Sequence, residues 1–156
     1  MQNEASARNQ SAIFQEERAK EDRDNKAEIY IKFLDAANNY ASVAHLLYTC
    51  TSELAEESSG QTFTVDGDCA KLAIDLRASW REFQTARNSV YFFGSEEAER
   101  KARVLAAYLP DATSAGQLPG DIFDLGSFNF DMFSGLYRDF QRVACMELPA
   151  NPRKSC

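Results

Sequence analysis

The sequence predicts an all-α protein: an antiparallel up-down-up-down four-helix bundle with an extended, charged first helix. Two observations predict it. Apolar residues after position 27 recur at steps of three and four, which is the period of a helix with one buried face. Only residues 62–65 alternate as a strand would, and we expect them to form a short extended return segment. Connections of short or medium length favour antiparallel neighbours.

The first helix is predicted to have two halves of different character. Residues 16–26 are almost all charged, and Lys20 lies four residues from both Glu16 and Asp24, a spacing that supports a solvated helix. The apolar stripe begins later and consists of Tyr30, Phe33, Ala37, Tyr40, Ala44 and Leu47. We therefore expect one helix from near Arg8 to Leu47 or beyond. Residues 1–27 would form a solvated extension or stalk, and the bundle domain would begin at residue 28.

The second helix is expected from about Ala70 to Phe92, after a turn at residues 66–68. Its predicted inner row is Ala73, Leu76, Trp80, Phe83, Arg87 and Val90. Gly94 can end this helix and Ser95 can cap the next, which is expected from Glu96 to Leu109.

The fourth helix is expected to begin near Phe130, after a loop over residues 110–120 that holds two prolines and two glycines. Its inner residues would come from two adjacent rows, listed as Phe133, Leu136, Phe140 and Val143, then Phe130, Tyr137 and Ala144. The bundle domain would end at residue 148, leaving residues 149–156 as a polar tail.

The predicted topology divides the four cysteines into two local pairs. Cys50 and Cys69 would share one end of the bundle, and Cys145 and Cys156 the other. The alternative is that Cys50 and Cys145 are small core residues, Cys69 lies at a turn and Cys156 is a free thiol. A zinc site of four cysteines is disfavoured because the close pairs of such sites are missing.

The chain carries none of the residue patterns of the common catalytic or cofactor sites. It has one histidine, no Glu-x-x-His pair, no phosphate-binding glycine loop and no complete calcium loop. We predict no catalytic residues, no cofactor and no metal, and an enzyme is not the favoured interpretation.

Three residues are candidates for an interhelical cleft that would bind a small ligand. His45 borders the inner stripe, Arg87 interrupts an apolar row, and Trp80 lies in the middle of the second helix. The simpler interpretation is that His45 keeps its polar tip in water, Arg87 reaches the surface or a structural carboxylate, and Trp80 is a central core residue.

The segment from Phe123 to Phe140 has more aromatic residues than one buried row needs. The candidate interaction patch comprises Phe123, Phe128, Phe130 and Met132. These side chains would either plug the open end of the bundle or form an exposed patch for a partner.

Charge and hydropathy limit the classes of partner that the chain is expected to bind. With 24 acidic and 17 basic residues the net charge is -7, which argues against binding nucleic acid. No apolar run in the sequence is long enough to cross a membrane, so a membrane link is expected only through an anchor upstream of this chain.

The run from Glu17 to Ala37, which includes Glu28-Ile29-Tyr30-Ile31-Lys32-Phe33, resembles uncharacterised bacterial helical proteins that often carry a membrane-spanning helix just before it. The resemblance implies a juxtamembrane stalk and an extracytoplasmic bundle, a compartment in which disulfides persist. It implies no activity and no functional residues.

The leading hypothesis is a non-enzymatic helical interaction or sensor-like domain that binds a protein partner or a second copy of itself. A small-ligand-binding bundle or an unfamiliar enzyme is the alternative from another class. A third is an acidic inhibitor or immunity-type protein that acts by charge complementarity.

Overall fold

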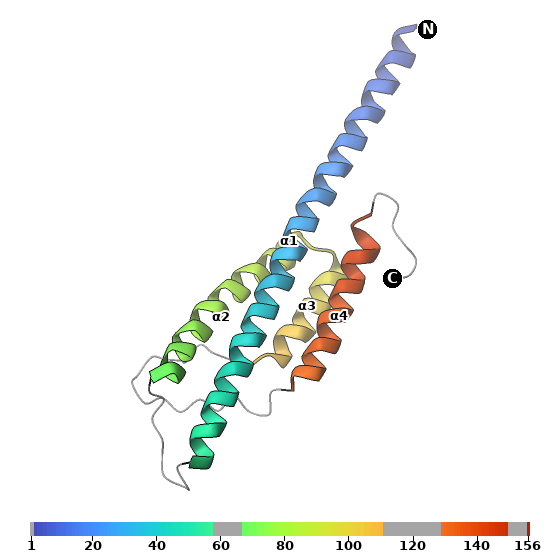
Figure 1. The fold of residues 1–156 in the computed structure, drawn as a ribbon. Coiled ribbons are helices and arrows are strands. Elements are labelled where there is room, and N and C mark those ends of the chain that lie inside the picture. Colours follow the sequence, from blue (N-terminus) through green and yellow to red (C-terminus); the bar gives the residue numbers. More distant parts are fainter. Residues whose placement is uncertain (1, 58–66, 111–128, 150–155) are drawn as a thin grey trace.

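The computed structural model describes residues 2–57, 67–110, 129–149 and 156 (Figure 1). These residues form four helices, α1 (Gln2–Glu57), α2 (Gly67–Phe93), α3 (Glu96–Tyr108) and α4 (Phe130–Glu147). No strand occurs within the described ranges, so the all-α prediction is confirmed. The extended segment expected at residues 62–65 lies outside them, as does all but the first residue of the loop expected at 110–120.

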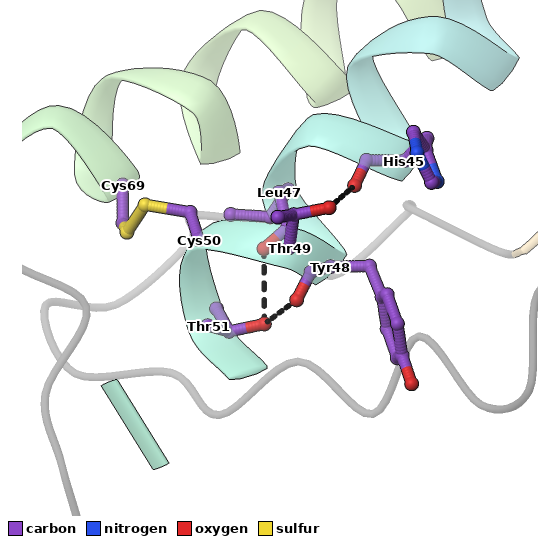
Figure 2. Close-up of a disulfide and its surroundings, with 7 residues drawn as sticks. All are labelled: His45, Leu47, Tyr48, Thr49, Cys50, Thr51 and Cys69. Carbon is purple, nitrogen blue, oxygen red and sulfur yellow. Dashed lines mark hydrogen bonds between the residues drawn. A yellow bond between two sulfur atoms is a disulfide. The ribbon is translucent and has the colours of Figure 1, made fainter. Parts of the chain in front are cut away.

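Both α1 and α2 begin earlier in the chain than predicted, α1 at Gln2 and α2 at Gly67. α1 ends at Glu57, beyond Leu47 as the prediction allowed. Two threonines within α1 satisfy their hydroxyls on the helix itself: Thr49 donates to the carbonyl of His45 at 3.0 Å and Thr51 to that of Leu47 at 2.9 Å (Figure 2). Because their hydroxyls are satisfied in this way, Thr49 and Thr51 are compatible with a helix that continues past Leu47.

Contacts along the helices define their directions. α1 and α2 are joined between Cys50 and Cys69 and pack again where Tyr40 meets Trp80, so they run in opposite directions. α3 begins beside Tyr30, because the Ser95 amide donates to its hydroxyl at 3.1 Å. α4 ends beside the same hydroxyl, which donates to Glu147, and begins beside His45 at Phe130, so it runs opposite to α1. Figure 1 shows the charged half of α1 projecting beyond the other three helices.

The core is built from the rows that the sequence predicts. Every member of the α1 stripe has an exposed fraction of zero. The other buried residues of the predicted rows are Ala73, Leu76, Phe83, Val90, Phe133, Phe140 and Val143, and α3 with its C-cap adds Ala98, Ala102, Leu105 and Leu109. Phe130, which the sequence predicts to be an inner residue, is instead 37% exposed at the start of α4. Aromatic rings link the helices through this core: Phe33 lies 4.6 Å from Phe140 and 5.7 Å from Phe83 between ring centroids.

The prediction that Trp80 is a central core residue is wrong. Trp80 is half-buried, and its ring packs on Tyr40 at a centroid distance of 5.2 Å. It lies beside the row of Leu76, Phe83 and Val90, so one side of the indole remains outside the core. The neighbouring Ser79 is buried instead, and its hydroxyl donates to the Leu76 carbonyl at 3.0 Å.

A cluster of hydrogen bonds, which we call the clamp, joins α1, α3 and α4 at Tyr30, just after the charged half of α1. The Tyr30 hydroxyl donates to one oxygen of Glu147 at 2.8 Å, and the Ser95 hydroxyl donates to the other at 2.5 Å. Ser95 also caps α3, as predicted, because its hydroxyl accepts from the Ala98 amide at 3.0 Å. The Glu147 carboxylate at the end of α4 thus binds both Tyr30 of α1 and the start of α3.

The turn between α2 and α3 approaches α2 too closely for a larger residue at position 94. The Gly94 amide donates to the Val90 carbonyl at 2.8 Å, and a Cβ at Gly94 would lie 2.5 Å from that oxygen. Glycine is therefore required for Ser95 to reach the clamp.

Both local cysteine pairs form disulfides. Cys50 joins Cys69 with the Cα atoms 6.0 Å apart, and Cys145 joins Cys156 with the Cα atoms 6.1 Å apart. The first staples α1 to α2 and the second ties the chain's last residue to α4. No free cysteine is left, so the alternatives of core thiols and a zinc site do not apply to this structure.

The clamp predicts the effect of removing one hydroxyl. Tyr30→Phe keeps the ring but leaves the Glu147 carboxylate with one partner fewer, so the free energy of unfolding should fall by about 1.5–3 kcal/mol. Urea denaturation measures it, with Tyr91→Phe as the control because Tyr91 is 61% exposed. Equal loss in the two variants would contradict the clamp.

Burial raises the pKa of the Tyr30 phenol, and the bond to Glu147 raises it further while the Ser95 amide lowers it. Because the folded pKa is raised, this stabilising contribution is complete below the unfolded pKa of about 10. It should be lost as the pH rises above that value and through the folded pKa. Phenolate absorbance and stability against pH measure this, and Tyr30→Phe should make the alkaline loss less steep.

The disulfides predict that the native protein has no titratable thiol before reduction. Replacing Cys50 and Cys69 together by serine should lower the free energy of unfolding by about 3 kcal/mol, because the unfolded chain regains the freedom of the closed loop. Thiol titration and denaturation test both statements. Free thiols in the unreduced protein would refute the pairing.

Candidate functional site

A groove with a volume of about 1120 Å³ lies along α1 and α2. We call it the α1–α2 groove. It is lined by Asp22, Asn25, Lys26, Glu28, Ile29, Lys32, Asp35, Ala36, Asn39, Arg81, Glu82, Thr85, Ala86, Ser89 and Phe93. A groove between two parallel or antiparallel helices has the shape that a further helix can occupy.

The apolar part of the α1–α2 groove comes from a few residues of small or medium size. Ile29, Ala36 and Ala86 are half-buried, so part of each side chain remains accessible from the groove. Phe93 lines it near the end of α2 and is 65% exposed. These residues share the groove because each lies on the side of its helix next to the buried row.

Charges of both signs surround this apolar part. Glu28 and Lys32 pair with each other at 2.6 Å, and the hydrogen bond from Lys32 lowers the pKa of Glu28. The remaining charged lining residues form no ion pair with another described residue; they are Asp22, Lys26, Asp35, Arg81 and Glu82. Their charges are available to a partner.

The last turn of α2 presents three consecutive aromatic side chains to solvent. Tyr91, Phe92 and Phe93 are 61%, 70% and 65% exposed. Their rings contact one another, with centroids 5.2 Å apart for the first two and 6.4 Å for the last two. Helical periodicity does not predict this cluster, because three consecutive residues do not share one buried face of a helix.

Neither of the two cavities described for this structure brings His45, Trp80 and Arg87 together. His45 is exposed and its ring lies 5.5 Å from that of Phe130 at the start of α4. Neither His45 nor Trp80 lines either of the two cavities described here, whereas Arg87 lines a small one between α2 and α3. The helical positions of the three residues point to different neighbours, α4, α1 and α3. Figure 2 also shows the His45 ring pointing away from the disulfide of Cys50.

The predicted aromatic patch is described only in part. Phe130 is 37% exposed and Met132 57% exposed. Phe123 and Phe128 lie outside the described residues. Asn129 is the N-cap of α4, which was not predicted, and its side-chain oxygen accepts hydrogen bonds from the Asp131 and Met132 amides at 3.0 and 3.1 Å.

Within the described ranges, no three histidine, cysteine or acidic residues are grouped so that they could hold a metal ion. None of the described helices combines the length and the apolar content that crossing a membrane requires. Comparisons with protein-family models, with curated proteins and with solved structures find no match to this chain. The described residues thus define an all-α fold of four helices stapled by two disulfides.

Proposed function

We propose that this protein is a non-enzymatic helical interaction domain that binds a protein partner along the α1–α2 groove. The observation that carries the proposal is the open groove itself, about 1120 Å³ in volume, whose apolar residues are framed by one ion pair, Glu28 with Lys32, and by further charges that pair with no other described residue. Apolar contacts would supply most of the affinity, and the charges would select the partner and its register.

The charged half of α1 serves this function as a stalk. Side chains from residue 10 to Asp22 are exposed, so the helix has no packed face there. Its resemblance to segments that follow a membrane anchor favours tethering at the N-terminal side, with the bundle in an extracytoplasmic compartment. Two disulfides support an oxidising environment.

Photocrosslinking from the groove tests the partner. A benzophenone amino acid in place of the exposed Thr85 should capture a discrete protein in native extract, whereas the same group at Val104, 48% exposed on α3, should not. Ala86→Trp, which fills the groove, should remove the adduct, and Val104→Trp should not. Equal capture from both positions would reject the groove as the binding surface.

Trapping thiols in living cells tests the compartment. Rapid alkylation before lysis should leave all four cysteines unmodified, because an oxidising compartment maintains both disulfides. Extensive alkylation would show that the protein resides in a reducing compartment. It would contradict the proposal that the bundle is tethered in an extracytoplasmic compartment.

A further inference from the structure

A second, smaller cavity lies between α2 and α3, away from the α1–α2 groove. Its volume is about 350 Å³, and it is lined by Arg87, Asn88, Tyr91, Glu99, Ala102 and Arg103. This size is at the lower end of the range for small-molecule sites.

Arg87 is the distinctive residue of this cavity. It falls between Phe83 and Val90, both fully buried, so its side chain is half-buried against the core. Within the part of the chain that the structure describes, its guanidinium makes a long hydrogen bond to the Gln84 side-chain oxygen at 3.4 Å. It forms no ion pair with another described residue. A guanidinium in this position keeps most of its five donors available.

Arg103 brings a second guanidinium to the cavity from α3. It is bonded to Glu99, one turn earlier on the same helix. The amide of Asn88 and the hydroxyl of Tyr91 add further donors. Two arginines and one glutamate give the lining a formal charge of +1, although the whole chain carries -7. The Glu99 carboxylate is therefore an internal anion that already occupies one of the two arginines.

We propose that this cavity binds a small organic anion, whose carboxylate or phosphate group lies between Arg87 and Arg103. The planar guanidinium matches both oxyanions through paired hydrogen bonds. Tyr91, 61% exposed, offers a ring on which an aromatic or planar part of the ligand can pack. The site is independent of the α1–α2 groove, since the two cavities share no lining residue.

The charges of the cavity give substitutions with opposite expected effects. Arg87→Gln removes a charge-assisted contact and should weaken binding about tenfold or more. Glu99→Gln removes the internal competitor and should tighten binding severalfold, because it frees Arg103 for the ligand. A merely structural role for these residues would not produce changes of opposite sign.

The experiment titrates the full chain with benzoate, phenyl phosphate, acetate and inorganic phosphate. Binding is followed by calorimetry and by the nuclear magnetic resonance signals of the arginine side chains. We expect saturable binding of at least one aromatic anion, and the better of benzoate and phenyl phosphate identifies the carboxylate or phosphate source. Arg138→Gln is the matched control, because Arg138 is exposed on α4 and lies outside the cavity. Thermal melting confirms that each variant is folded.

Three results would overturn the proposal. Binding could fail to saturate with every probe, which indicates only general attraction of anions to arginine. Arg87→Gln could bind as tightly as the unaltered chain. Arg138→Gln could lose as much affinity as Arg87→Gln, which would place binding elsewhere.

Discussion

The Tyr30 hydroxyl imposes the constraint on which the joining of the helices depends. The ring lies in the core with no exposed surface, so its polar end must find partners there. Glu147 accepts from it and the Ser95 amide donates to it. The hydrogen bonds of this one buried hydroxyl therefore bring the start of α3 and the end of α4 to the Tyr30 position of α1. The Tyr40 hydroxyl repeats the device farther along α1, where it donates to the Pro110 carbonyl.

This arrangement confines function to the outer faces of the bundle. The apolar stripe of α1 is used completely by the core, and aromatic contacts such as Phe33 with Phe140 fill the centre. The flanking positions carry what remains: small apolar residues and charges along the α1–α2 groove, and two arginines between α2 and α3. The two surfaces differ in chemistry, because one mixes apolar area with both charges and the other is rich in hydrogen-bond donors.

The different surroundings of His45, Trp80 and Arg87 show what helical periodicity alone does not determine. Steps of three and four place Trp80 and Arg87 in the same row as Phe83, yet both are only half-buried. The helical period does not determine whether a residue at the edge of an apolar row is buried. That depends on where the neighbouring helices lie. His45 likewise borders the stripe of α1 but meets Phe130 of α4 instead of α2.

The sequence alone determined the helices, most of their inner rows and the division of the cysteines into two local pairs, because a period of 3.6 residues and short chain separations are local properties. It left open whether the cysteines are oxidised. It also identified Ser95 as a cap, since capping depends on residues three apart. Only the tertiary structure decided that Glu147 joins Tyr30 and Ser95, and that Arg87 and Arg103 line one cavity. Those residues are distant in the chain, and their meeting depends on how the helices are placed around the common core.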